Sequence, residues 1–126
     1  MELTTEWMAE NFARFNMQYF NSELPTPQFV INDKLRERGS CGAKNWRVEH
    51  PNFVIRLSNH FERTEYDYQC TLLHEMIHLY WQSRKEWKVG HGEKFVEMAM
   101  RLREMGWDIS VPYRSERYVK QYKSPL

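Results

Sequence analysis

The longest uninterrupted helical pattern in the chain runs from about Glu65 to Gln82. No proline or glycine occurs between Asn59 and Val89, so no residue in this segment is expected to break a helix. Its apolar positions fall on more than one side of a helix: Leu72, Leu73, Met76, Ile77, Leu79 and Tyr80. A helix that is apolar around most of its circumference is usually buried, so we expect this one to lie at the centre of the fold.

Amphipathic helices are predicted on either side of this segment. From Thr5 to about Phe20, apolar residues recur at helical spacing: Met8, Phe12, Phe15 and Tyr19. From Gly92 to about Met105, one side carries Phe95, Met98, Ala99 and Leu102. Gly106 is a typical end for this helix. Beyond Val111, Tyr118 and Tyr122 stand four residues apart, which predicts a last short helix.

Three short strands are predicted between the first helix and the central one. They are placed at Phe29–Ile31, near Ala43–Val48 and at Phe53–Leu57, with Arg38–Gly42 read as a turn. Strands that are segregated from the later helices indicate an α+β fold. Because Phe53–Leu57 directly precedes the central helix, we expect it to be an edge strand that can pair with an extended peptide.

The central helix contains the motif His74-Glu75-Met76-Ile77-His78. Residues four apart on a helix lie nearly above one another, so the two imidazoles point at one place and Glu75 can reach a water there. Two neutral imidazoles suit Zn²⁺, a third ligand nearly completes a tetrahedron, and the open fourth position holds the reactive water. His91 is the candidate third ligand, because its flanking glycines let the chain bend. The pattern therefore favours a zinc peptidase site.

Alternatives for the third ligand remain on spacing alone. Glu93 and Glu97 are both possible, although Glu97 points about 120° away from His91 on a helix. Position 84 is an arginine, which excludes the metzincin arrangement. Without a metal, His74 and His78 would be core histidines that need separate hydrogen-bond partners. His50 and His60 have no partner at ligand spacing and are expected to be ordinary histidines.

Several other side chains are candidates for the cleft. Cys41 could approach the metal, although a small, partly buried residue is favoured there. The remaining candidates are aromatic. Trp46, Trp81 and Trp87 could line the cleft or stack on nucleic-acid bases, with Trp81 expected in the core. Tyr80 or Tyr113 could donate a hydrogen bond to the oxyanion.

Length and composition limit the alternatives. The 126 residues predict one domain, residues 1–126. The net charge of +1 predicts no strong attraction to membranes or nucleic acids, and no apolar run approaches membrane-spanning length. Two cysteines are too few for a disulfide scaffold, and the acidic start lacks the apolar region of a signal peptide, so we expect a cytoplasmic protein.

The C-terminal tail, residues 111–126, is locally basic. Four cations against one acid give it +3, which leaves −2 for the rest of the chain. Arg114, Arg117 and Lys120 are spaced three apart, which fits either a stripe that contacts phosphates or a solvated helix face.

The two histidine segments together resemble a known family. Leu72-Leu73-His74-Glu75-Met76-Ile77-His78, followed by Gly90-His91-Gly92-Glu93-Lys94-Phe95, is similar to the SprT-like metalloprotease domain, including that of Spartan proteases. The resemblance covers about residues 10–108. It implies a zincin-like fold, Zn²⁺ held by His74, His78 and His91, and Glu75 as the catalytic base.

The resemblance also suggests substrates and partners. Better-known eukaryotic members cleave proteins crosslinked to DNA, using DNA-binding elements outside the protease domain. Some relatives carry a C-terminal zinc ribbon, which two cysteines cannot form. We therefore expect a zinc metalloendopeptidase acting on proteins, DNA-associated ones among them, with weak DNA binding through the tail. The alternative is a zinc-stabilised module associated with nucleic acids, whose protease site is idle or restrained. The oligomeric state is left open.

Overall fold

A small three-stranded sheet and two long helices form the body of the structure. This computed structural model describes residues 1–125. The elements, in chain order, are α1 (Thr5–Tyr19), β1 (Gln28–Asn32), β2 (Gly39–Ala43), β3 (Phe53–Ser58), α2 (Glu65–Gln82), α3 (Glu93–Glu104), the 3₁₀ turn η1 (Tyr113–Ser115) and α4 (Glu116–Gln121). The predicted α+β class is confirmed.

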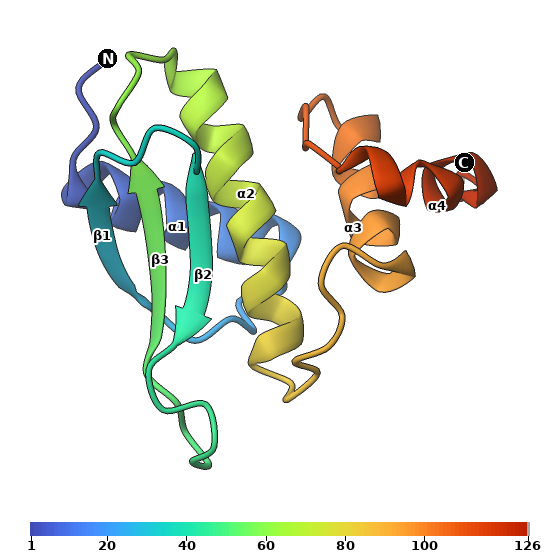
Figure 1. Ribbon diagram of the computed structural model, residues 1–126, viewed down its shortest axis with the longest axis horizontal. Helices are drawn as coiled ribbons and strands as arrows, with labels where there is room; N and C mark the ends of the chain where they lie inside the picture. The colour runs from blue at the N-terminus through green and yellow to red at the C-terminus, as the bar shows by residue number, and fades with distance from the viewer. Residues whose placement is uncertain (126) are drawn as a thin grey trace.

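The sheet places β3 at its centre rather than at its edge. The strand order is β1-β3-β2, with β1 parallel and β2 antiparallel to β3. The prediction of an edge strand at Phe53–Leu57 is therefore wrong. The physical reason is visible in the sequence, because Phe53, Val54 and Ile55 are consecutive apolar residues, all buried, which is typical of a strand covered on both faces of the sheet. The edge strand beside α2 is β2 (Figure 1).

The second strand begins earlier than its sequence suggests. It was expected near Ala43–Val48, but residues 44–50 form turns and bends, while most of the predicted turn is strand β2. Gly39 explains the difference. A Cβ atom there would lie 3.0 Å from Thr71 Cγ2 and 3.1 Å from Glu75 Oε2. This glycine marks a close approach of β2 to α2 and does not make a turn.

Capping and core packing fix the two long helices. Thr4 Oγ1 accepts a hydrogen bond from the Trp7 amide at the start of α1, and Thr64 forms a capping box with Asp67 at the start of α2. In Figure 1, α1 crosses behind the sheet and α2 runs alongside β2. The core between them contains Met8, Phe12, Phe15, Ile55, Leu57, Leu72, Leu73, Met76 and Ile77.

The last part of the chain returns to α2 after α3. Gly106 has a φ of 100°, the left-handed conformation that ends many helices. The chain then passes through Ile109, which is fully buried, and through η1 before α4 packs on α3. The predicted short final helix is confirmed as α4. Within residues 1–125, no helix is both long and apolar enough to cross a membrane.

Candidate metal centre

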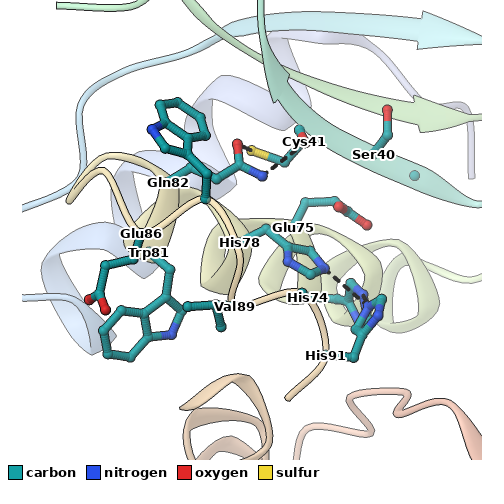
Figure 2. Close-up of a pocket in the computed structure, with 13 residues that line it drawn as sticks. Ser40, Cys41, His74, Glu75, His78, Trp81, Gln82, Glu86, Val89 and His91 are labelled. Atoms are coloured by element: carbon teal, nitrogen blue, oxygen red, sulfur yellow. Dashed lines mark hydrogen bonds between the residues drawn. The ribbon is translucent and has the colours of Figure 1, made fainter. Parts of the chain in front are cut away.

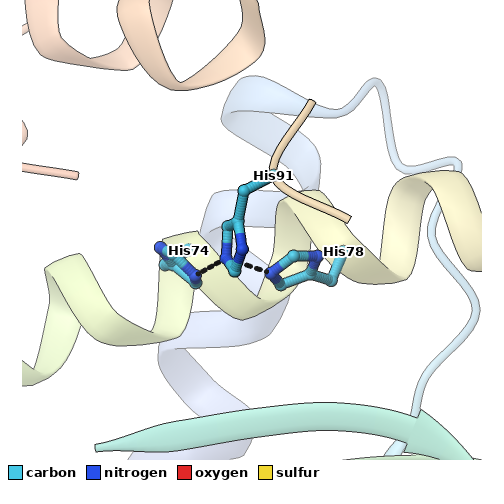
Figure 3. A group of neighbouring side chains, drawn as sticks. All are labelled: His74, His78 and His91. Atoms are coloured by element: carbon cyan, nitrogen blue, oxygen red, sulfur yellow. Dashed lines mark hydrogen bonds between the residues drawn. The ribbon is translucent and has the colours of Figure 1, made fainter. Parts of the chain in front are cut away.

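Three histidine rings converge on one point. The Nε2 atom of His91 lies 3.1 Å from His74 Nε2 and 3.1 Å from His78 Nε2 (Figure 3). Nitrogens bound about 2.0–2.1 Å from one tetrahedral ion are about 3.3 Å apart, which is close to this spacing. The three histidines are therefore positioned to hold a metal ion.

Two elements bring these rings together. His74 and His78 stand one turn apart on α2, and His91 reaches them from the loop between α2 and α3 (Figure 3). Gly90 has a φ of 52°, a conformation that residues with a side chain rarely adopt. The expectation that a glycine bends the chain beside His91 thus holds at Gly90. Gly92 has an ordinary φ of −76° and serves as the N-cap of α3.

Phe95 packs against all three rings. This side chain on α3 is fully buried. Its ring centroid lies 4.8 Å from that of His74, 4.7 Å from that of His78 and 4.8 Å from that of His91. The spacing from His91 to Phe95 in the sequence motif therefore has a packing role as well.

The electrostatic surroundings keep the imidazoles neutral. Burial and the neighbouring His91 lower the pKa of His74 to about 4. Burial and the two other histidines lower the pKa of His78 to about 3. Burial and then the charge of Arg114 lower the pKa of His91. Neutral imidazole is the form that binds metal, so the site is prepared for an ion.

The chain after α3 contributes two further contacts to the ligands. His74 Nδ1 lies 3.0 Å from the carbonyl oxygen of Ser110, so Nδ1 carries the proton and Nε2 keeps its lone pair free. Ser115 Oγ donates to the carbonyl oxygen of His91 over 2.7 Å, and Ser115 is only 4% exposed. Sequence reasoning missed both serines, because no local pattern links them to residues more than twenty positions away.

Glu75 lies beside the triad in the same cleft. The cleft has a volume of about 310 Å³ and is lined by β2, α2 and the loop that carries His91 (Figure 2). Glu75 is 5% exposed, and its carboxylate accepts no hydrogen bond from any residue in the range 1–125. Burial, and then the charge of Glu37, raise the pKa of Glu75 to about 8. This carboxyl group is thus poorly solvated and has a high affinity for a proton.

Cys41 faces the cleft but not the metal ligands. Its Sγ lies 3.7 Å from Gln82 Oε1, and Gln82 Nε2 donates to the Cys41 carbonyl oxygen over 3.2 Å (Figure 2). Burial is the main cause that raises the pKa of the thiol. A protonated thiol is a poor ligand, so the structural role that the sequence favoured agrees with these contacts.

The acidic alternatives for the third ligand lie outside the triad. Glu97 is exposed and pairs with Arg101 over 2.7 Å, and Glu93 is exposed at the start of α3. His50 is exposed, while His60 Nδ1 lies 3.1 Å from the Asp33 carbonyl oxygen. Among the described residues, the metal-ligand cluster consists of His74, His78 and His91.

The aromatic candidates divide between the cleft and other places. Trp81 and Trp87 line the cleft, although Trp81 also packs against the core as expected. Tyr80 is covered by the Arg84 guanidinium, 3.6 Å from its ring centroid, and does not line the cleft. Tyr113 is 92% exposed in the segment between Ser110 and Ser115, and it does not line the cleft either.

Comparison with known families agrees with this geometry. The model of the SprT-like family matches residues 8–117. The chain belongs to the SprT-like family. The match extends beyond the resemblance seen in the sequence, because it includes Ser110 and Ser115 as well as the triad. The family is one of zincin-like, metallopeptidase-type domains. None of the curated proteins compared with the chain matches it.

Proposed function

We propose that this protein is a zinc-dependent metalloendopeptidase that hydrolyses peptide bonds of protein substrates. The observation that supports this most strongly is the convergence of three neutral imidazoles beside a buried carboxylate in an open cleft. Membership of the SprT-like family agrees with it. Neither a structural zinc site nor a purely structural histidine cluster needs such a carboxylate.

The ligand set fits a catalytic metal better than a structural one. Structural zinc is usually closed by four protein ligands, whereas catalytic zinc keeps one position open. Among residues 1–125, three side chains form the cluster, and the cleft lies beside them. When bound, Zn²⁺ would supply a Lewis acid that acidifies water and polarises the peptide carbonyl.

Glu75 is the group that moves the proton. Its poorly solvated carboxylate takes a proton from the attacking water and later delivers it to the nitrogen of the leaving amine. The raised affinity for a proton, which follows from burial, suits a base that must also act as an acid. A nearby divalent cation would lower this pKa and bring the group back towards ionisation at neutral pH.

The edge strand β2 is the surface along which we propose that the substrate lies. Among residues 1–125, β3 is its one strand partner, so its other edge has no strand partner there, and Ser40 and Cys41 line the cleft. An extended peptide can add to such an edge through backbone hydrogen bonds. We therefore assign to β2 the pairing with an extended peptide that was first expected of β3. Such pairing needs a peptide backbone, so it favours a polypeptide substrate over a small amide.

The Glu75→Gln variant tests the mechanism. It keeps the shape of the side chain but cannot accept a proton, so cleavage of an unfolded protein should fall by at least about a hundredfold. Zinc content and the far-UV spectrum should stay unchanged. The ligand variant His91→Ala should lose zinc. Its matched control is His60→Ala, which removes a histidine outside the triad and should keep zinc. Wild-type cleavage by Glu75→Gln would refute the mechanism, and full zinc in His91→Ala would remove His91 from the site.

A second function remains a candidate on one observation. The cations at Arg114, Arg117 and Lys120 are all exposed on the segment η1–α4, as a phosphate-binding surface would require. On this reading the protein is a nucleic-acid-associated module whose protease site is restrained. Cleavage assays with and without single-stranded DNA distinguish the two, because a restrained site should show activity only when DNA is present.

A further inference from the structure

An apolar hollow adjoins the metal cleft at the end of α2. It has a volume of about 610 Å³, and its apolar lining residues are Trp46, Trp87 and Val89. Charged residues also line it: Lys85, Glu86, Lys88, Glu93 and Lys94. Glu86, Trp87 and Val89 line both the hollow and the metal cleft. The two spaces therefore share part of their walls and lie next to each other.

The two tryptophans of this hollow are held differently. Trp87 stacks on the buried Phe53, with ring centroids 6.1 Å apart and an interplanar angle of 23°. Trp46 meets Trp87 edge to face at 5.9 Å and is 48% exposed, in the turn after β2. Trp87 is thus held by packing. Trp46 has the Arg47 guanidinium 4.9 Å from its ring centroid and still leaves apolar surface in water. Such exposure beside a cleft is typical of a binding surface.

The charged residues of the lining do not make the hollow a phosphate site. Lys85 Nζ donates to the Val48 carbonyl oxygen over 2.5 Å, and the Lys94 ammonium pairs with Glu86. Both ammonium groups are engaged within the protein, and their alkyl stems add apolar surface. Lys88, the third lysine of the lining, is exposed. One exposed ammonium beside the carboxylates of Glu86 and Glu93 attracts phosphates only weakly, so the lining favours an apolar side chain.

We propose that this hollow is a specificity subsite that receives one large apolar side chain, aromatic, leucine or methionine, from the polypeptide being cleaved. The proposal rests on the proposed peptidase function, because it assumes that the peptide backbone follows β2 past the histidines. It defines the substrate class more narrowly. Large apolar side chains are mostly buried in folded proteins, so the enzyme should prefer unfolded or locally unfolded segments.

Peptide binding to the Glu75→Gln variant tests the subsite without any cleavage. The probe is an alanine- and serine-based decapeptide with one phenylalanine, compared with the same peptide carrying alanine in its place. Binding is followed through the indole NMR signals of the tryptophans. The phenylalanine peptide should shift Trp46 and Trp87 but not Trp7, and it should bind at least about tenfold more tightly than its alanine counterpart.

Variants of the hollow provide the controls. Combined with Glu75→Gln, Trp46→Ala should remove the tenfold preference, and Trp46→Phe should keep part of it. Phe61→Ala is the matched control, because Phe61 is an aromatic residue with 51% exposure that lines neither the hollow nor the cleft. It should leave the preference unchanged. Equal binding of the two peptides, or an unchanged preference in Trp46→Ala, would overturn the proposal.

Cleavage-site mapping and a DNA-binding assay distinguish this proposal from the alternatives. Wild-type cleavage sites in an unfolded protein, mapped by mass spectrometry, should show large apolar residues enriched at one fixed distance from the cut. Trp46→Ala should lose this enrichment. If nothing is cleaved but the phenylalanine peptide still binds at Trp46, the peptidase function fails and the subsite stands. If oligo(dT) shifts Trp46 and Trp87 while the peptide does not, the hollow is a base-stacking surface and the proposal is wrong.

Discussion

The position of His91 depends on side chains that do not touch a metal. Phe95 packs edge to face against the His91 ring, and Ser115 Oγ donates to the His91 carbonyl oxygen. His91 also follows Gly90, whose left-handed φ would be strained with any side chain. A loop residue held by three such constraints is preorganised for binding, which reduces the cost of ordering the ligand when the ion arrives.

At the residue scale, Ser115→Ala should weaken the metal site without removing a ligand. The change deletes the buried hydrogen bond to the His91 backbone, and loss of such outer contacts typically lowers metal affinity by about 10–100-fold. Competition with a zinc chelator measures the affinity. The matched control is Ser83→Ala, which also deletes a hydroxyl donor to a backbone carbonyl, that of Tyr80, away from the triad. Equal zinc affinities in the two variants would show that Ser115 does not position His91.

At the scale of secondary-structure elements, the close approach of β2 to α2 places the carboxylate in the cleft. Gly39 allows this approach, because a Cβ there would lie 3.0 Å from the Arg56 carbonyl oxygen and 3.1 Å from Glu75 Oε2. Backbone cannot move aside as a flexible side-chain end can. The absence of a side chain at Gly39 therefore lets the edge strand β2 lie against α2 beside Glu75.

Gly39→Ala should therefore disturb both stability and catalysis. Forcing a methyl group into this contact should cost about 1–3 kcal/mol of unfolding free energy. Displacement of the Glu75 carboxylate should lower kcat more than it changes zinc content. The control is Gly42→Ala on the same strand, where a Cβ would meet nothing within 4 Å. Urea denaturation and peptide cleavage measure the two effects. A Gly39→Ala enzyme that matches Gly42→Ala in both would show that the space is not needed.

The elements that the sequence predicted best are those whose signals are local. Helix α2 was expected at Glu65–Gln82 and is observed there, because its pattern, the absence of breakers and its motif agree. The histidine triad was also predicted, since helical spacing and a flanking glycine are local facts. The predicted position of β2 was too late in the chain, because Gly39 and Gly42 suggested a turn. Gly39 instead permits a close contact with α2. Strand order, Ser110 and Ser115 depend on long-range packing that no local pattern encodes.

At the scale of the whole molecule, a metal ion would join distant parts of the chain. The ligands come from α2 and the loop after it, and Ser110 and Ser115 fasten the segment after α3 to two of them. Binding to the folded state alone stabilises a protein by about 4 kcal/mol when the free ion is a thousandfold above its dissociation constant.

Removal of metal should consequently lower the melting temperature by about 10–15 °C, given the usual entropy of unfolding for a chain of this size. Calorimetry of the protein before and after chelation, with zinc added back, measures this. His91→Ala should show a much smaller response to zinc, and magnesium should restore little of the loss, since it prefers oxygen ligands. A melting temperature indifferent to zinc in the wild type would mean that the triad does not hold the ion in the folded protein.

The distribution of charge over the whole molecule predicts how its affinity for DNA should depend on salt. The net charge is +1, and the exposed cations Arg114, Arg117 and Lys120 lie together on η1–α4. Three neutralised phosphates on a single strand should give a plot of log affinity against log salt with a slope near −2. Replacing the three by glutamine should flatten this slope by about two units.

The control replaces Lys34, Lys44 and Lys88, which are also exposed, so that both variants carry a formal charge of 1 − 3 = −2. Zinc content must be checked in the first variant, because the charge of Arg114 acts on His91. Equal flattening in both would assign the binding to overall charge, and no binding by the wild type at low salt would exclude the tail as a DNA contact.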